Sequence, residues 1–121
     1  MATVRYIVTD VQQAVEFYTR SFDFKVQQQF GPNMAILRLG DLTLWLAGPN
    51  ASASRPMPDG RKPEPGGWNR FVLEVSDLPA TVAKLKAQGV RFRNEIVSGP
   101  GGQQILAEDP FGNVVELFQP A

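Results

Sequence analysis

One short pattern occurs twice in this chain, and it constrains the fold more than any other feature. Val8-Thr9-Asp10-Val11 returns as Val75-Ser76-Asp77-Leu78, with the two aspartates 67 residues apart. In each copy a β-rich run ends at an aspartate that can accept hydrogen bonds from the free amides of a helix's first turn. Apolar residues then recur at helical spacing, and three further β-rich runs separated by turns follow. This order predicts an α+β fold made of two strand–helix–three-strand (βαβββ) units.

The turn residues and caps give bounds for each expected element. In the first copy we expect a strand at 4–8, a helix at 11–21, and strands at 24–30, 34–39 and 42–46. In the second copy we expect a strand at 69–75, a helix from about 77 to 88, and strands at 90–97, 103–108 and 114–118. Residues 99–102 are expected to form a hairpin turn. Tyr6 and Tyr18 are expected in the core.

Between the two copies lies a proline-rich segment at residues 48–67. It contains five prolines among glycines and charged residues and shows no periodicity. Such a segment is unusually long for a compact domain, so it is either functional or a connection. We expect one domain, with unit one at 1–47, a linker at 48–67 and unit two at 68–121. The segment is an inert linker or a lid that brings Arg55, Asp59 and Arg61 to a ligand.

Composition excludes several classes of function. Lysine plus arginine and aspartate plus glutamate number 12 each, and no basic stripe suggests a nucleic-acid partner. No stretch approaches the roughly 20 apolar residues of a membrane span. The start of the chain has no apolar signal segment, so we expect a cytoplasmic protein. The chain has neither cysteine nor histidine, which removes thiolate and imidazole chemistry.

The last expected strand, 114–118, contains one unusual residue. Asp109-Pro110 begins a turn and Gly112-Asn113 can take positive φ, and the strand after them is apolar apart from Glu116. An ionised carboxylate in such a strand is costly unless another group pairs with it. What Glu116 faces is therefore the central question about function.

Two stretches of the chain resemble a known family. Residues 8–24 (VTDVQQAVEFYTRSFDF) and 106–120 (LAEDPFGNVVELFQP) resemble the vicinal oxygen chelate superfamily. This superfamily includes glyoxalase I, extradiol dioxygenases, fosfomycin-inactivating enzymes and bleomycin-sequestering proteins. The resemblance implies paired units whose curved sheets form a cleft, helices on the outer faces, and often a homodimer that sometimes exchanges units.

The resemblance also implies four metal-ligand positions, on the first and last strand of each unit. Here they are occupied by Thr3, Arg70, Glu116, and either Leu44 or Trp45 depending on register. The enzymes of the family typically have histidines and glutamates there, and only Glu116 is of a ligand type. An arginine cannot lose its proton to bind a metal. We therefore expect no metal and no other cofactor.

Strand alternation gives a candidate lining for the cleft. The lining residues come from the first, fifth and last strands, with Trp45 as a wall and Trp68 at the mouth. We expect the ligand to contact Arg5, Ile7, Trp45, Trp68, Arg70, Glu74, Glu116 and Phe118. In one interpretation Arg70 and Glu116 form an ion pair where a metal once lay. In the other, Arg70 or Arg5 anchors a carboxylate or phenolate of the ligand.

Three functions remain open, and they differ in what they require of the carboxylates. The first is a metal-free binding protein that sequesters a small, partly aromatic molecule, which needs only apolar walls and a few polar anchors. The second is a metal-independent enzyme with Glu116 or Glu74 as general base, and an adjacent arginine opposes that role. The third is a metal-dependent enzyme of the glyoxalase or dioxygenase type. In each case we expect a small-molecule ligand and a homodimer.

Overall fold

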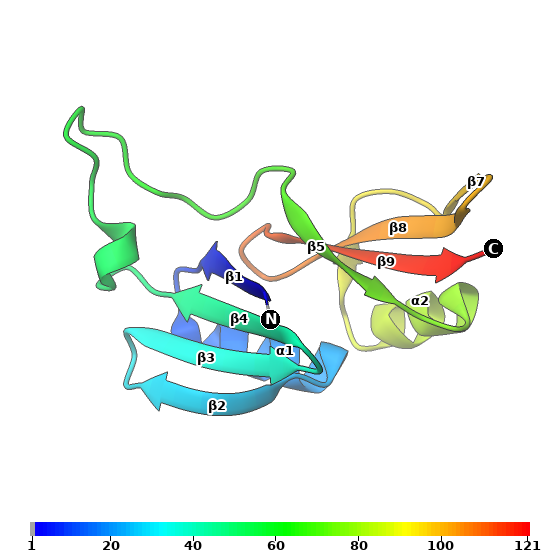
Figure 1. Ribbon diagram of the computed structural model, residues 1–121, viewed down its shortest axis with the longest axis horizontal. Coiled ribbons are helices and arrows are strands. Elements are labelled where there is room, and N and C mark those ends of the chain that lie inside the picture. The colour runs from blue at the N-terminus through cyan, green and yellow to red at the C-terminus, as the bar shows by residue number, and fades with distance from the viewer. Residues whose placement is uncertain (1) are drawn as a thin grey trace. The chain divides into compact units, whose positions relative to one another are not determined.

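A computed structural model describes residues 2–121, and the chain divides into two compact units with the boundary between Gly66 and Gly67. Each unit has an open sheet and one α-helix, as Figure 1 shows by colour along the chain. The expected α+β class and the two repeated units are confirmed. The expectation of a shared cleft stays a prediction.

The first unit consists of four strands and one long helix. Its elements are β1 (Ala2–Ile7), α1 (Val11–Phe22), β2 (Lys25–Phe30), β3 (Met34–Leu39) and β4 (Leu42–Ala47). The strand order is β1-β4-β3-β2, with β1 parallel to β4 and the other pairs antiparallel. Helix α1 connects β1 to β2 and packs against β2, β3 and β4. One face of the sheet is thus covered by its own helix.

Helix α1 begins at the predicted residue and ends one residue later than predicted, at Phe22. The side chain of Asp10 accepts from the backbone N–H of Gln13, and Asp23 closes the helix in the left-handed conformation at φ 61°. The ring of the fully buried Tyr18 lies edge-on to Phe17, at 5.1 Å, and to Phe24, at 5.7 Å. Such aromatic pairs add to the stabilisation from burial alone. The expectation that the two tyrosines are core residues is confirmed, since Tyr6 is also buried.

The second unit repeats this plan with one difference. Its elements are β5 (Arg70–Glu74), α2 (Leu78–Ala87), β6 (Arg91–Phe92), β7 (Val97–Gly99), β8 (Gly102–Glu108) and β9 (Val114–Pro120). The strand order is β5-β9-β8-β6, with β7 also paired to β8, and β5 runs parallel to β9. Asp77 caps α2 by accepting from the N–H of Ala80. The hairpin turn expected at 99–102 is confirmed, because Gly99 pairs with Gly102.

The expected strand at 90–97 is wrong, because the chain there forms two short strands, β6 and β7. The side chain of Asn94 interrupts the ladder between them. Its Oδ1 accepts the backbone N–H of Leu106 at 3.0 Å, where a continuous strand would supply a backbone carbonyl. Asparagine side chains compete with the backbone in this way. The strand resumes at Val97, which pairs with Gln104.

The turn between β8 and β9 is built around Asp109, whose side chain is fully buried. Its Oδ1 accepts the backbone N–H groups of Phe111 and Asn113, each at 2.9 Å, and its Oδ2 accepts from Asn113 Nδ2 at 3.0 Å. Gly112 takes the expected positive φ, at 87°, whereas Asn113 does not. A single carboxylate therefore fixes the turn that delivers Glu116 to the sheet.

Residues 48–66 belong to the same compact unit as β1–β4. They contain a short 3-10 helix, η1 (Ser52–Ser54), held by the Ser54 hydroxyl, which donates to the carbonyl of Gly48 at 2.7 Å. Further along, Arg61 pairs with Asp59. Whether the segment acts as a linker or a lid stays open. Within residues 2–121 no helix is long and apolar enough to cross a bilayer.

Candidate functional site

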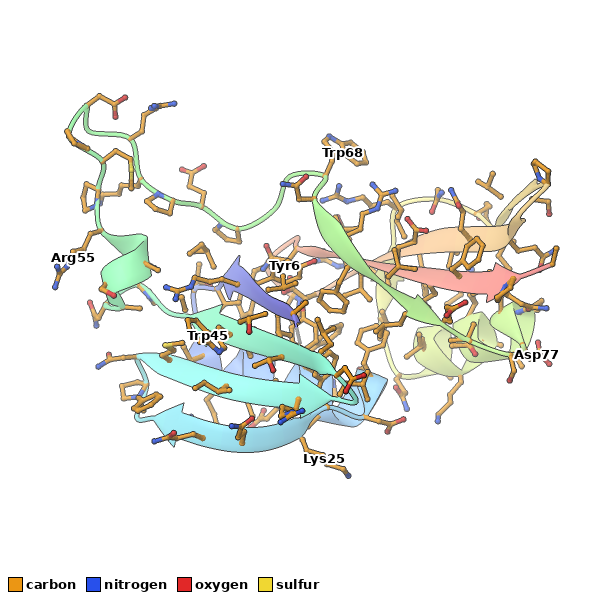
Figure 2. The ribbon with its side chains drawn as sticks, in the orientation of Figure 1. Tyr6, Lys25, Trp45, Arg55, Trp68 and Asp77 are labelled. Atoms are coloured by element: carbon orange, nitrogen blue, oxygen red, sulfur yellow. The ribbon has the colours of Figure 1, made fainter. Side chains whose placement is uncertain are left out.

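In the first unit, strand register decides which residues lie on the face that α1 leaves uncovered. Arg5 lies opposite Trp45, which in turn lies opposite Ile36. These three side chains share a face because paired positions in neighbouring strands point the same way. Leu44 is fully buried on the α1 side. Trp45, which is labelled on β4 in Figure 2, thus lies on the uncovered face of the sheet, and its place in a cleft stays a prediction.

A groove of about 470 Å³ lies on this face. Its apolar walls are Phe30, Met34, Ile36 and Trp45, and the guanidinium of Arg5 lies 4.8 Å from the centre of the Trp45 ring. Its polar lining comes from Asn33, Asn50 and Ser52. This volume falls within the range of small-molecule sites, and the mixture of apolar walls with few polar groups is typical of them.

Ile7 does not line this groove. It lies instead in a second hollow of about 700 Å³, formed with the proline-rich segment. That hollow carries both signs of charge, from Arg55, Lys62 and Glu64. Residues Asn50 and Ala51 line both spaces. The structure therefore brings Arg5 and Trp45 into one groove and places Ile7 in its neighbour.

In the second unit, Arg70 and Glu116 form an ion pair, as the first of the two interpretations of the sequence expects. Nε and Nη2 of Arg70 donate to the same oxygen, Glu116 Oε1, at 3.0 and 2.9 Å. Nη1 of Arg70 donates to the carbonyl oxygen of Trp68 at 3.1 Å. The Glu116 side chain is 11% exposed and that of Arg70 is 30% exposed. The carboxylate is thus nearly enclosed, and the guanidinium still reaches solvent.

The other residues expected in this unit differ in exposure. Glu74 is exposed at the end of β5 and lies opposite the half-buried Phe118. Trp68 is 68% exposed, and Figure 2 shows it projecting from the start of β5. Its ring lies under the guanidinium of Arg93, 4.6 Å from the ring centre. Each of the chain's two tryptophans therefore stacks with an arginine of its own unit.

Arg93 is a residue that the sequence analysis missed. Its Nε donates to Glu108 at 2.7 Å, Nη1 to the carbonyl of Gly67 at 2.8 Å, and Nη2 to the carbonyl of Gly112 at 2.9 Å. Arg93 thus links the residues just before β5 to the turn that precedes β9. Arg70 lies on the first of these strands and Glu116 on the second. It lies in the stretch predicted to be one continuous strand, where alternation alone gave it no special role.

The residues at the family's metal positions do not fit a divalent metal. The Trp45 side chain has no lone pair to offer a metal, and the neutral hydroxyl of Thr3 is a poor ligand. Arg70 is a cation that cannot become a ligand. Glu116, the one carboxylate of the four, already accepts two hydrogen bonds from Arg70 through Oε1. A transition metal needs several imidazole, thiolate or carboxylate donors that converge. These four positions do not supply such a donor set, and the expectation of a metal-free site stays a prediction.

Comparison with known proteins gives a family match and similar structures. The model of the Glyoxalase/Bleomycin resistance protein/Dioxygenase superfamily matches residues 1–117. TnmS3, an antibiotic binding protein from Streptomyces sp. CB03234, is 26% identical with a TM-score of 0.72 and covers 98% of this chain and 93% of its own. A search of curated proteins gave no match.

Two more distant structures share the fold. Lactoylglutathione lyase from Agrobacterium tumefaciens is 19% identical with a TM-score of 0.76, covering 98% of this chain and 92% of its own. A genomically encoded fosfomycin resistance protein from Listeria monocytogenes is 14% identical with a TM-score of 0.75, covering 100% and 93%. At these identities the likeness concerns the fold alone.

Proposed function

Because the chain belongs to the Glyoxalase/Bleomycin resistance protein/Dioxygenase superfamily, we propose that it is a metal-free binding protein that sequesters a small, partly aromatic molecule. The observation that carries the proposal is the groove beside Trp45. It offers four apolar walls and one cationic anchor within about 470 Å³. Planar molecules are well suited to such aromatic walls. The similarity to a protein described as antibiotic binding supports the same class of function.

The alternative is a metal-independent enzyme in which Glu116 or Glu74 acts as general base. The arrangement around Glu116 does not favour it. A base must be able to take a proton, and two N–H groups of Arg70 already donate to Oε1 of this carboxylate. A general base must also be within reach of the proton that it takes, and the Glu116 side chain is only 11% exposed. Glu74 is exposed at the end of its strand and lines neither the groove nor the neighbouring hollow, so binding remains the function we propose.

A thermal-shift screen tests the proposal with the protein as it is. Planar aromatic metabolites and antibiotics are screened in buffer that contains EDTA, and again with zinc, nickel or manganese. Ligands that bind the folded state raise the melting temperature. We expect some compounds to raise the melting temperature, and by the same amount with and without metal. A library that gives hits only in the presence of metal would contradict the metal-free proposal.

Two residues on opposite faces of β2 provide a matched pair of variants for any hit. Phe30 and Val26 are similarly exposed, at 47% and 46%. Phe30 lies opposite Met34 on the groove face, whereas Val26 lies opposite Leu37 on the α1 face. Phe30→Ala is expected to weaken ligand binding, and Val26→Ala is expected to leave it unchanged. Equal ligand affinities in the Phe30→Ala and Val26→Ala variants would show that the groove is not the binding site.

A further inference from the structure

The four strands of the first unit carry charges of one sign only. Within residues 2–121, strands β1 to β4 contain Arg5, Lys25 and Arg38 and no aspartate or glutamate. The register places all three cations on the face that α1 leaves uncovered. The strands of the second unit are different, since they include the acidic residues Glu74, Glu108 and Glu116. The strand residues on the groove face of the first unit therefore contribute only positive charge.

Arg5 is the cation that lines the groove, and it forms no ion pair with the described residues. In the part of the chain that the structure describes, three ion pairs form, and they join Arg61 to Asp59, Arg70 to Glu116 and Arg93 to Glu108. Arg5 takes part in none of them, although it is exposed and lines the groove. Stacking on Trp45 orients the guanidinium and leaves its N–H donors available. A planar guanidinium held in this way matches the geometry of a carboxylate.

We propose that the groove binds a planar aromatic molecule that carries a negative charge, such as an aryl carboxylate. The aromatic ring would lie among Phe30, Met34 and Ile36, beside Trp45, and the anionic group would accept from Arg5. This inference rests on the proposed binding function and narrows it to one class of ligand. No carboxylate lines the groove within residues 2–121, so a cationic ligand would find no opposite charge there.

A matched pair of probes separates charge from shape. 2-Naphthoate and 2-naphthamide have the same ring system, but only the first is an anion. The indole N–H signals of Trp45 and Trp68 are followed by NMR during titration and are assigned from the signal that disappears in Trp68→Phe. We expect the Trp45 signal to shift saturably, with naphthoate bound about three- to tenfold more tightly than the amide, because a charge-assisted hydrogen bond replaces a neutral one. Added salt is expected to narrow this difference.

Two arginine variants then locate the charge. Arg5→Met keeps an apolar stem beside Trp45, and it is expected to lower the affinity for naphthoate to that for naphthamide. Arg38→Met is the control, because Arg38 lies on the same face and donates to the carbonyl of Gly40 outside the groove. It is expected to leave both affinities unchanged. An equal loss of naphthoate affinity in the two variants would mean that the anion responds to the summed positive charge of the face and not to Arg5 itself. That result would overturn the proposal.

The possible outcomes separate this inference from the proposed function. If naphthamide binds at Trp45 as tightly as naphthoate, the charge requirement is wrong while the groove remains a small-molecule site. If neither probe shifts the Trp45 signal at millimolar concentration, the inference fails, and the proposed function then depends on the thermal-shift screen alone. If the Trp45 signal instead changes with protein concentration in the absence of probe, a second copy of the chain occupies the face and the inference is overturned.

Discussion

The ion pair between Arg70 and Glu116 makes a quantitative prediction about stability, because its two partners differ in exposure. Breaking a buried pair costs about 3–5 kcal/mol, whereas exposed pairs contribute about 0.2–1 kcal/mol. Arg70→Met leaves a carboxylate that is only 11% exposed without a partner. Glu116→Gln leaves a guanidinium that is 30% exposed and can turn to water. The arginine change is therefore expected to be the more harmful one.

We expect Arg70→Met to lower the free energy of unfolding by about 3 kcal/mol and Glu116→Gln by about 1.5 kcal/mol, between the limits for buried and exposed pairs. For a chain of this size, these losses correspond to roughly 10 °C and 5 °C in melting temperature. The double variant removes both charges together. It is expected to recover at least about 1 kcal/mol relative to the sum of the single losses, as contacting residues do.

Urea and thermal unfolding, followed by circular dichroism, measure all three free energies. The matched control is the exposed pair of Arg61 and Asp59, whose side chains are 83% and 54% exposed. Arg61→Met and Asp59→Asn are expected to change stability by less than about 0.5 kcal/mol. Strictly additive single effects at Arg70 and Glu116 would refute the pair. Equal losses from the two single changes would refute the argument from exposure.

Four further predictions concern backbone, turn, metal and assembly. Gly102→Ala is expected to lower the free energy of unfolding by more than about 2 kcal/mol, because φ is 147° and a Cβ would overlap the carbonyl oxygen of Gln119. Thermal unfolding measures this loss, and Gly101→Ala is the control because a Cβ at Gly101 would lie in open space. Asp109→Ala is expected to cost about 3 kcal/mol in urea unfolding, because it leaves two backbone N–H groups of the turn without an acceptor. Protein purified without a histidine tag is expected to contain far less than one equivalent of zinc, nickel, iron or manganese, and elemental analysis near one equivalent would contradict this. Light scattering at micromolar concentration is expected to give a homodimer, twice the chain mass of 13.3 kDa, and a monomer mass would count against it.

Much of the fold could be predicted from local signals. Asp10 and Asp77 mark the starts of both helices, because their side chains satisfy free backbone amides there. The strand at 34–39 has the predicted bounds. The interruption at Asn94 could not be predicted, because it depends on a hydrogen bond to Leu106 in another strand. Local alternation contains no information about such a partner.

The candidate site could be predicted only in part. The pairing of Glu116 follows from the cost of an isolated carboxylate in an apolar strand, and Arg70 is its partner. The orientation of Trp45 does not follow from its own strand, because buried residues lie on both faces of β4 and alternation there gives no direction. Only the pairing with β1 places Trp45 beside Arg5. The role of Arg93 depends on carbonyls of two distant segments and has no local signal.

The hairpin of β8 and β9 also has a consequence for the order of folding. Its cross-strand contacts are local in sequence, and Asp109 closes its turn, whereas the pairing of β5 with β9 joins distant residues such as Val72 and Glu116. Closing a long loop costs more entropy, so local contacts form sooner. We expect substitutions at Asp109 to slow refolding and substitutions at Arg70 mainly to accelerate unfolding. In the second unit, the last strand of the sequence would thus belong to the folding nucleus.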